Sequence, residues 1–417
     1  MDYSYRVVTA CRLCGSTNLD IALSLEPMPL GDQYLPKGGG ASDVKLVPFG
    51  INICPDCGNF QTVTAIDREH YRHCLTRPAS TNLKLGSAYR ESVPYLLELT
   101  DFSSSDLMLE IGSNDGLFAS FFAERGFRCL GVEPALNLLK DAEACGVSIV
   151  PDFFTRSVAE KIVSEYGVAK IIVANSVVAN VDDLDDFIIG INKVLAEDGI
   201  CVMETNSVSD VVSSLLVETL VHEHLCYFSV TALAKYFEKH GLEMFNVKKV
   251  PAKGGSLRCF IKHKNSKLKV EQSVSDAIDL ERSLEIFSPH AWAKFQNTFS
   301  DIRNLIKKFC VEKSQYGIVG YGTSDGATTL IYQLGFGEYL KALIDDDPVR
   351  QNLESPGFAI PTVDRTEIFT DQPKALNCLI LAPQYVHQIF EKNKSAQESG
   401  VSFLQVWPRL EIMGSVL

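Results

Sequence analysis

The spacing of apolar and polar positions changes along the chain, and these changes divide it into three parts. Residues 1–82 are irregular, with Pro27, Pro29 and the run Gly38–Gly40 interrupting short apolar stretches. Such punctuation predicts a small module of short strands. From residue 83 the spacing becomes regular, and the amphipathic stretch over residues 83–99 predicts a helix.

After this helix, short apolar runs alternate with amphipathic stretches, which predicts a sheet with helices between its strands. The runs are Leu107–Ile111, Arg128–Val132, Val147–Val150, Lys170–Ala174 and Ile200–Glu204. Strands that alternate with helices usually form a parallel sheet, in which ligands bind beyond the carboxyl ends of the strands. Binding residues are therefore expected directly after each strand.

A second alternating unit is predicted after a helix-rich connector over residues 270–313. Gly317–Gly326 has the pattern of a strand followed by a glycine turn, and Ala342–Asp345 that of a second strand ending in an acid. Alone, this pattern could be an NAD site. However, Gly326 comes one residue later than the dinucleotide fingerprint requires, and Asp325 would repel a pyrophosphate near the helix start. A Rossmann-like domain that holds substrate without its own cofactor is therefore favoured.

Two Cys-x-x-Cys pairs give the strongest chemical signal in the chain. They are Cys11 with Cys14, and Cys54 with Cys57, and a glycine follows the second cysteine of each pair. Each tight turn directs two sulfurs to one point, and four thiolates suit tetrahedral Zn²⁺. The glycines suit turns that free backbone amides for the sulfurs. The sequence therefore predicts a structural zinc site.

The first predicted strand of the regular part ends in the segment Glu110–Gly116. Its glycines would let the backbone pass close to a ligand before the next helix. Asn114 stands where the NAD fingerprint has its second glycine, so the segment is a poor pyrophosphate cradle. The candidate cofactor-binding residues of this segment are Glu110, Gly112, Asn114, Asp115 and Gly116.

Residues at the ends of the next three strands point to an adenosine ligand. Glu133 ends the second strand, where a carboxylate can accept both ribose hydroxyls. Asp152 and Phe153 follow the third strand and could bind the adenine amino group and stack on the ring. Asn175 closes the fourth strand, near the expected methionyl portion. Each could be a mere strand terminus, but their coincidence predicts an S-adenosylmethionine site.

The segment His222-Glu223-His224, after the fifth strand, is the second chemical cluster. A second metal site would need a remote ligand, because the segment lacks the His-Glu-x-x-His spacing of zinc hydrolases. A solvated loop is the alternative without function. The place of the segment after the fifth strand favours a catalytic role. Histidine titrates near neutrality and can remove a proton.

Composition excludes several classes of protein. The formal net charge is -13, and no cluster of lysine and arginine suggests a nucleic-acid groove. No run of eighteen apolar residues and no leader pattern begins the chain, so we expect no membrane insertion and a cytoplasmic location. Most cysteines outside the two pairs stand in apolar runs and are expected to be reduced core thiols, namely Cys129, Cys201, Cys310 and Cys378.

Together these motifs resemble the zinc-containing, S-adenosylmethionine-dependent sugar C-methyltransferases of deoxysugar biosynthesis. The resemblance covers nearly the whole chain, because the family's motifs occur in the same order. They are the paired cysteines, Glu110–Gly116, Glu133-Pro134, Asp152-Phe153-Phe154, Glu223–Ser229 and Gly254-Gly255.

The resemblance implies an α/β chain of three parts: a zinc-binding module over residues 1–82, a class I methyltransferase domain with a Rossmann-like fold over residues 83–269, and, over residues 270–417, a helical connector with a second Rossmann-like domain that holds substrate. It further implies methylation at C3 of a nucleotide-linked 4-keto-6-deoxyhexose. Carbon beside a ketone becomes a nucleophile only after it loses a proton. His224 is the preferred base, and Glu223 would orient the sugar or His224.

Three positions depart from the family pattern. Val221 stands where the family commonly has a tyrosine, and Asn180 stands in place of a histidine after the fourth strand. A further tyrosine expected before the first Rossmann unit is absent at residues 77–80, although Tyr71 is nearby in the sequence. At Val221 and Asn180 the absent residues are candidate proton handlers, so the acceptor atom stays open. Methylation of a sugar oxygen or of another carbon, a non-catalytic sugar-nucleotide-binding protein, and loss of activity are the alternatives.

Overall fold

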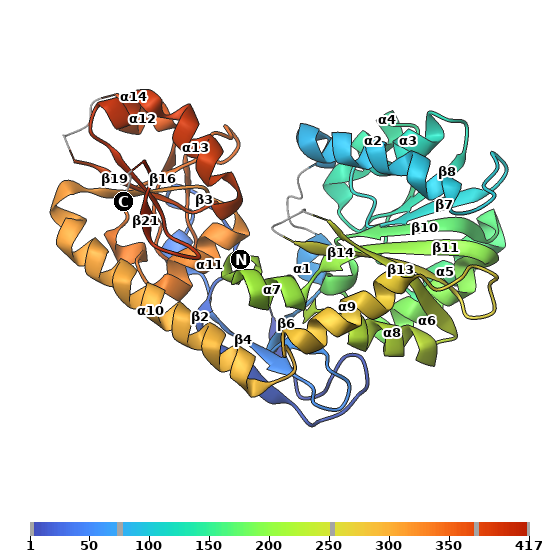
Figure 1. Cartoon of the computed structure of the whole chain (residues 1–417). Coiled ribbons are helices and arrows are strands. Elements are labelled where there is room, and N and C mark those ends of the chain that lie inside the picture. The colour runs from blue at the N-terminus through green and yellow to red at the C-terminus, as the bar shows by residue number, and fades with distance from the viewer. Residues whose placement is uncertain (1–3, 73–77, 251–254, 371–374, 415–417) are drawn as a thin grey trace.

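The structure is a computed structural model that describes residues 4–72, 78–250, 255–370 and 375–414. Figure 1 shows two lobes, with the central part of the chain on the right and the C-terminal part on the left. The N-terminal region, in blue, lies between and below them, and the long helix α10 (Pro289–Lys313) runs along the left lobe toward it. Among the described residues, no helix is both long and apolar enough to cross a membrane.

The central lobe is built on a seven-stranded sheet with the order β13-β14-β11-β10-β7-β8-β9. The five strands predicted from the sequence are all present. The ends of the first four agree to within one residue, whereas β11 begins at Leu195 and ends at Asn206, well outside the predicted Ile200–Glu204. Its elements are α2 Leu83–Glu98, β7 Leu107–Ile111, α3 Leu117–Ala123, β8 Arg128–Val132, α4 Leu139–Ala144, β9 Ser148–Val150, α5 Arg156–Tyr166, β10 Ala169–Asn175, α6 Leu184–Val194, β11 Leu195–Asn206, α7 Val208–Ser214, α8 Val230–Lys239, β13 Leu242–Val250, β14 Ser256–His263 and α9 Gln272–Ser283.

The alternating pattern predicted a parallel sheet, but one strand of the sheet is antiparallel. Strand β14 runs antiparallel to both of its neighbours, β11 and β13, whereas the other pairs are parallel. The connection from Val250 to Ser256 is too short for the crossover helix that a parallel pair needs. The order with one antiparallel strand near the edge is the class I methyltransferase arrangement that the family resemblance implied.

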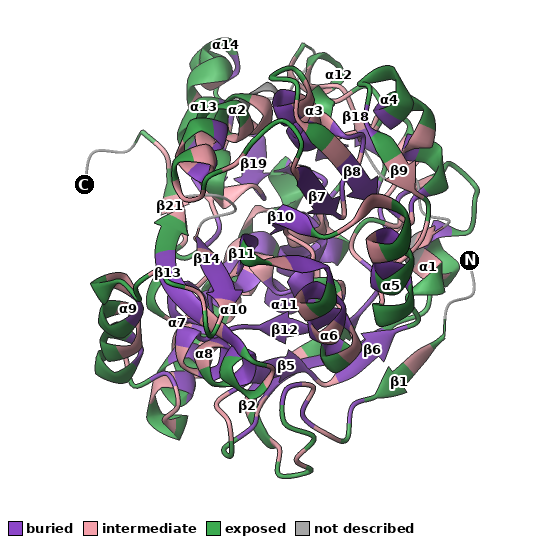
Figure 2. Ribbon diagram, turned by 90° about the vertical axis from the view of Figure 1, so that its right-hand side faces the viewer, coloured by how far each residue is buried: buried purple, intermediate pink, exposed green. Residues whose placement is uncertain are grey.

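Burial explains why the apolar runs became central strands. Every residue of β7 is buried, and β10 is buried except at its last residue, Asn175. Strands covered on both faces by helices read as continuous apolar runs. Figure 2 shows these strands buried inside the lobe, while the helices around them keep exposed outer faces. Three of the predicted core thiols, Cys201, Cys310 and Cys378, are buried, and Cys129 is half-buried.

The N-terminal module forms a four-stranded sheet with the order β12-β5-β4-β2. Its strand β12 (Cys226–Tyr227) comes from the central part of the chain and pairs antiparallel with β5. The sequence pattern did not predict that a strand from the central part of the chain belongs to this sheet. The other elements are β1 Tyr5–Val7, β2 Asp20–Met28, β3 Leu35–Pro36, η1 Ala41–Asp43, β4 Val47–Ile53, β5 Phe60–Thr62, β6 Thr64–Ile66, α1 Glu69–Arg72 and η2 Ala79–Thr81.

The module has little core of its own among the described residues. Its separate apolar clusters are small, one of them formed by Leu30, Val47 and Ile66. Leu13 packs into the core of the central lobe, and Phe60 packs into a core shared with the C-terminal part. The module is therefore held largely by packing on neighbouring cores, which suits a small irregular unit for which a metal site is predicted.

The C-terminal lobe is a second Rossmann-like unit. Its six-stranded sheet has the order β18-β16-β15-β19-β20-β21, and only the pair β20–β21 is antiparallel. The predicted strand and glycine turn at Gly317–Gly326 become β15 and the start of α11. Its elements are β15 Ile318–Tyr321, α11 Asp325–Leu334, η8 Gly337–Tyr339, β16 Leu343–Ile344, β17 Leu353–Glu354, β18 Thr362–Val363, α12 Arg365–Phe369, β19 Asn377–Ile380, η9 Pro383–Tyr385, α13 Val386–Lys392, α14 Lys394–Glu398, β20 Ser402–Gln405 and β21 Glu411–Ile412.

Candidate active site and zinc centre

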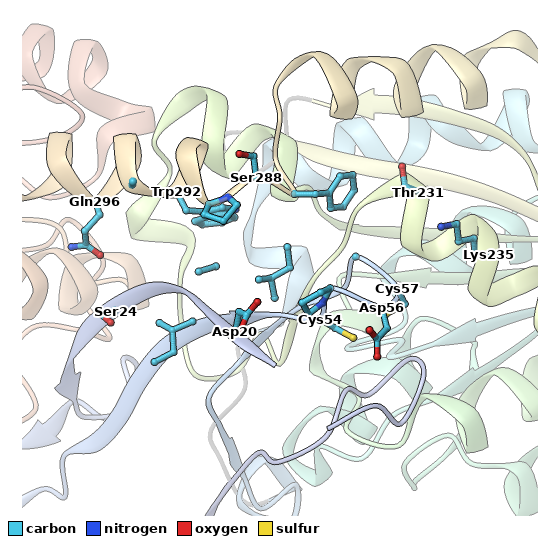
Figure 3. A pocket seen from close by; sticks show the side chains of 18 residues that line it. Asp20, Ser24, Cys54, Asp56, Cys57, Thr231, Lys235, Ser288, Trp292 and Gln296 are labelled. Atoms are coloured by element: carbon cyan, nitrogen blue, oxygen red, sulfur yellow. The ribbon is translucent and has the colours of Figure 1, made fainter. Parts of the chain in front are cut away.

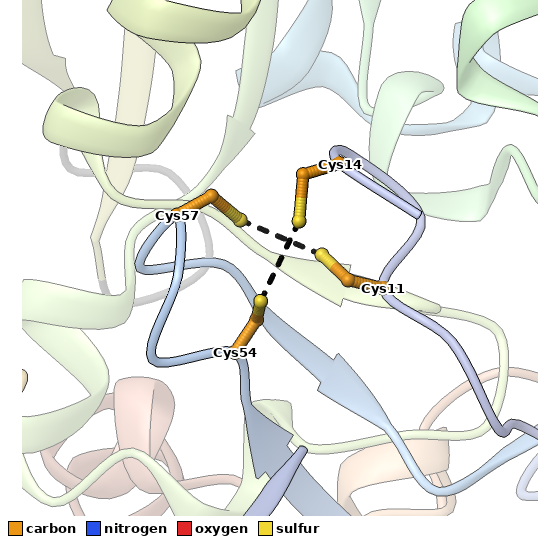
Figure 4. Close-up of side chains that lie close together, drawn as sticks. All are labelled: Cys11, Cys14, Cys54 and Cys57. Atoms are coloured by element: carbon orange, nitrogen blue, oxygen red, sulfur yellow. Dashed lines mark hydrogen bonds between the residues drawn. The ribbon is translucent and has the colours of Figure 1, made fainter. Parts of the chain in front are cut away.

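The four cysteines of the two pairs meet at one point (Figure 4). All four sulfurs lie within 4.8 Å of one another, with 3.5 Å between Cys11 and Cys57 and 3.6 Å between Cys14 and Cys54. Zn–S bonds of about 2.3 Å in a tetrahedron place the sulfurs about 3.8 Å apart. The donor set and its spacing therefore fit the zinc ion that the sequence predicted.

Each cysteine pair forms the same tight turn. Gly15 and Gly58 have φ of 76° and 79°, and their amides donate at 2.8 Å to the carbonyls of Cys11 and Cys54. A hydrogen bond from Cys57 is the main cause that lowers the pKa of Cys11 to about 5, and backbone amides of the first turn add to it. By contrast, burial raises the pKa of Cys54 to about 11, and the hydrogen bond to Cys11 raises the pKa of Cys57. Of these three cysteines only Cys11 thus favours the thiolate, and zinc binding requires the others to lose their protons as well.

The zinc turns are tied directly to the loop that carries His224. The backbone carbonyl of Leu225 accepts from Arg12 Nη1 at 3.3 Å and from the amide of Thr62 at 3.0 Å. Asn59 is buried and donates to the sulfurs of both Cys11 and Cys226 at 3.8 Å. Because β12 begins at Cys226, the loop continues as a strand of the zinc module's own sheet.

The imidazole of His224 is fixed by a contact to the backbone. Its Nδ1 lies 3.2 Å from the carbonyl oxygen of Thr219. A carbonyl only accepts hydrogen bonds, so in the neutral imidazole Nδ1 carries the proton and Nε2 carries the lone pair that proton removal requires. The hydroxyl of Tyr227 donates to the same carbonyl at 3.3 Å, which fixes the turn around His224.

His222 is placed differently from His224. It is buried, its ring centroid lies 4.4 Å from that of Phe49, and burial lowers its pKa to about 4. Among the described residues, the four cysteines are the only group of side chains close enough to hold a metal, so the alternative of a second metal site at this segment has no support. Of the two histidines, His224 is the half-buried one, which is what a base that meets substrate needs.

The loop of His224 lies at the carboxyl edge of the central sheet. The amide of Leu225 donates to Ala179 at 2.7 Å, and Ala179 belongs to η4 (Val178–Asn180), directly after β10. Phe228 bridges Ser207, which follows β11. The candidate base is therefore at the sheet edge where the predicted cofactor residues also end their strands.

At that edge, Glu133 is joined to the glycine segment. Its carboxylate accepts from the amides of Asn114 at 2.9 Å and Ala135 at 2.8 Å, and burial raises its pKa. Gly112 and Gly116 have φ of 68° and 75°, and a Cβ on Gly112 would lie 2.3 Å from Val177. The predicted ribose-binding carboxylate and the predicted close-approach turn are thus adjacent.

Three other residues of this segment also hold the protein's own backbone. Glu110 is buried and accepts from the amide of Ala119 at 3.0 Å, and burial raises its pKa. Asn114 Oδ1 accepts from Ala79 at 2.7 Å, and Asp115 Oδ2 accepts from Ser80 at 2.9 Å. Their side chains therefore position α3 and η2 around the site, and a direct role in cofactor binding stays a prediction.

Asp152 and Phe153 meet an arginine that the sequence did not single out. Arg72 Nη2 lies 2.9 Å from Asp152 Oδ1, and its guanidinium lies 4.7 Å from the centroid of Phe153. This ion pair lowers the pKa of Asp152. Arg72 comes from α1 of the zinc module, and no sequence pattern links it to β9. The expected adenine end of the site is thus covered by a second segment of that module.

Asn175 has unexpected neighbours as well. Tyr89, on α2, lies within hydrogen-bonding reach of Asn175, and burial raises its pKa. Glu204 on β11 is the strand partner of Asn175 on β10. Its Oε2 lies 2.7 Å from Nη2 of Arg258. The only sequence signal for Arg258 is its place shortly after Gly255 in the Gly-Gly motif, whose Gly254 lies outside the described residues.

Two of the three departures from the family pattern have clear positions. Val221 is buried, and its amide donates at 2.9 Å to the hydroxyl of Tyr227. Asn180 is exposed at the end of η4. The phenol of Tyr227 thus lies near the position where the family tyrosine is missing, although its hydroxyl is hydrogen-bonded to the backbone.

The glycine turn of the C-terminal lobe is occupied by protein groups. Asp345, at the end of its second strand, binds the hydroxyl of Thr323. Gly31 of the zinc module packs on Asp325, because a Cβ on Gly31 would lie 2.7 Å from Asp325 Cα. The hydroxyl of Thr328 donates to the carbonyl of Gly31 at 2.9 Å. These contacts take up the acid and the helix start that a dinucleotide would use.

A cavity of about 630 Å³ lies beside the second zinc turn, between β2, α8 and α10 (Figure 3). Trp292 lines one side, and Asp20 and Asp56 line the other. Phe287 also lines the cavity. None of the candidate catalytic or cofactor-binding residues lines it. The predicted active site is therefore separate from this cavity.

Glu133→Ala is expected to weaken S-adenosylmethionine binding. Loss of hydrogen bonds to a carboxylate costs about 2–3 kcal/mol, or roughly 30- to 150-fold in Kd. Isothermal titration calorimetry of the full chain measures this change. Glu197→Ala, at an exposed position of β11, is the matched control and should bind like the wild type. Equal affinity of both variants would remove Glu133 from the cofactor site.

Comparison with known proteins supports the fold and its chemistry. Three family models match the chain: "Putative zinc binding domain" over residues 11–71, "Methyltransferase domain" over residues 83–247 and "C-methyltransferase C-terminal domain" over residues 251–408. The chain is also 26% identical to C-methyltransferase NovU of Streptomyces niveus, in an alignment over 417 residues that covers 98% of each protein.

Solved structures show weaker likeness. A SAM-dependent methyltransferase from Anabaena variabilis is 17% identical, and the match covers 41% of this chain and 84% of that one with a TM-score of 0.32. The PH0226 protein from Pyrococcus horikoshii is 14% identical, with 48% and 100% covered and a TM-score of 0.38.

The fold and the matched domains define an S-adenosylmethionine-dependent methyltransferase with a zinc-binding domain. With its C-terminal domain, the chain is similar to C-methyltransferases in the order of its matched domains, in line with the order of motifs in the sequence.

Proposed function

We propose that the protein methylates a carbon, most simply C3, of a nucleotide-linked 4-keto-6-deoxyhexose. The observation that carries this proposal is the orientation of His224. Its Nδ1 is committed to the carbonyl of Thr219, so Nε2 is set up to accept a proton. A base of this kind suits methylation of carbon beside a ketone, because that carbon must first lose a proton.

The residues divide the reaction between them. His224 would remove the α hydrogen, and Glu223, beside it in the turn, would orient the sugar or the imidazole. Glu133, Asp152, Phe153 and Asn175 would hold the adenosine and methionyl parts of the cofactor, with the segment Glu110–Gly116 beneath them. Bound S-adenosylmethionine supplies an electrophilic methyl group. The protein's further contribution would be alignment of the nucleophilic carbon and exclusion of water.

The contacts of α11 support a substrate position between the lobes. A Cβ on Gly326 would lie 2.6 Å from the carbonyl of Glu218, and Thr329 donates to the carbonyl of Leu220 at 2.9 Å. Both carbonyls belong to the segment that leads into His224. A nucleotide sugar held by the C-terminal lobe could therefore extend its sugar to the base.

The test is product analysis with the purified full chain. It would be incubated with S-adenosylmethionine and 4-keto-6-deoxyhexoses linked to thymidine, uridine or guanosine diphosphate. Mass spectrometry detects methyl transfer, and NMR locates the new carbon. We expect a C-methylated product and exchange of the α hydrogen in deuterated water. No product from any of these sugars, while the cofactor still binds, would contradict the proposal.

Methylation of a sugar oxygen is the second candidate, and the replacements at Val221 and Asn180 favour it. An oxygen acceptor needs no α-hydrogen exchange and does not need the ketone. Transfer to the 4-hydroxy sugar without deuterium uptake would therefore identify an O-methyltransferase.

A further inference from the structure

Glu218 is a half-buried acid that the proposed chemistry does not yet use. It lies in η5 (Val217–Thr219), one residue before the carbonyl that holds His224. Its Oε2 is fully buried and has no hydrogen-bond partner among the described residues. An unpartnered buried carboxyl oxygen is costly, and in native proteins such groups usually meet a ligand, water or a reacting group.

The surroundings of Glu218 form a seam between two parts of the chain. On one side is η5, which continues into the loop of His224. On the other side is the first turn of α11. Gly326 in this turn lets the helix pack close to η5, because a Cβ on Gly326 would lie only 2.6 Å from the carbonyl oxygen of Glu218. Thr329 holds the same seam together through Leu220. The acid is thus fixed at the boundary between the two lobes, which Figure 1 shows around α11.

We propose that Glu218 binds a hydroxyl group of the substrate in the seam between η5 and α11, and so positions the substrate beside His224. This inference rests on the proposed function, because it needs a hydroxylated substrate. A carboxylate can accept two or more hydrogen bonds, and a sugar hydroxyl would satisfy the buried oxygen. The inference adds a positioning residue that the motif Glu223–Ser229 does not contain.

Ionisation of Glu218 gives the inference its own signature. Burial raises the pKa of Glu218 to about 7, and the residue's own amide partly offsets this effect. Ionisable groups on the two sides of the seam include Asp325 on α11, with the ion pair of Asp32 and Arg350 near it, and His224 on the loop. A bound hydroxyl stabilises the carboxylate and lowers this pKa. Binding should therefore release protons near pH 6.5 and tighten as the pH rises through about 7.

The experiment measures binding of 4-keto-6-deoxyhexoses linked to thymidine, uridine or guanosine diphosphate, at several pH values and without turnover. Calorimetry in buffers of different ionisation enthalpy gives both Kd and the protons released. For Glu218→Gln, which keeps the side-chain volume, we expect about tenfold weaker binding or more above pH 7 and loss of most of the proton release. Glu218→Asp should keep the proton release, and Glu197→Gln should match the wild type.

Two outcomes would overturn the inference. One is a Glu218→Gln variant that keeps wild-type Kd and proton release. The other is a Glu218→Asp variant that loses proton release together with Glu218→Gln, which would show a structural role only. Wild-type protein that binds S-adenosylmethionine but none of the sugar nucleotides would contradict the proposed function itself, so the two failures are distinct.

Discussion

Replacement of His224 by alanine is expected to abolish methyl transfer and α-hydrogen exchange together. A positioned base contributes about 10²- to 10⁴-fold to a rate, so kcat should fall by that factor. Binding of S-adenosylmethionine should be nearly unchanged, because the predicted cofactor residues lie on other loops. The measurements are product formation by mass spectrometry, deuterium uptake by NMR, and cofactor Kd by calorimetry.

The control for this variant is His290→Ala, at an exposed position near the start of α10. It removes an imidazole without touching the candidate site and should keep wild-type kcat. A His224→Ala protein that still exchanges the α hydrogen would mean that another group is the base. Exchange that persists while transfer is lost would instead give His224 a role in alignment.

Local patterns predicted the central sheet well because burial on both faces leaves a plain record in the sequence. Strands β7 and β8 have the predicted bounds, Leu107–Ile111 and Arg128–Val132. The cysteine turns were equally readable, since a Cys-x-x-Cys pair with a following glycine fixes its own geometry. In both cases the information is local, within about ten residues.

Contacts between distant segments left no such record. Strand β12 looks like part of a loop in the sequence, yet it completes the zinc module's sheet through Cys226 and Gln61. Arg72 meets Asp152 across 80 positions of the chain, and Tyr89 reaches Asn175 from a helix that reads as ordinary amphipathic structure. The hairpin of β13 and β14 was missed because only its short connection distinguishes it from a crossover.

These distant contacts give the zinc module a wider role than support of its own fold. Through Arg12 and Thr62 it holds the carbonyl of Leu225, next to the candidate base, and through Arg72 it reaches the expected adenine end. A module with little core of its own thus contacts both ends of the predicted site. Its folding, and the metal that stabilises it, should be coupled to catalysis.

Loss of the metal should therefore damage activity more than cofactor binding. In Cys14→Ser, a weaker fourth ligand should release zinc and lower the free energy of unfolding by about 4 kcal/mol or more. The loop of His224 would lose its anchoring strand partner, so kcat should fall at least as steeply as in the histidine variant. The glycine segment and Glu133 belong to the central lobe, so the cofactor Kd should change less.

Zinc content by elemental analysis, denaturant unfolding, kcat and cofactor Kd together test this coupling. Cys145→Ser is the matched control, because Cys145 is an exposed free thiol on the central lobe, outside the metal cluster. It should keep zinc, stability and kcat. A zinc-free Cys14→Ser protein with wild-type kcat would show that the loop of His224 keeps its place without the metal. That result would contradict the coupling of metal binding to catalysis through the pairing of β5 with β12.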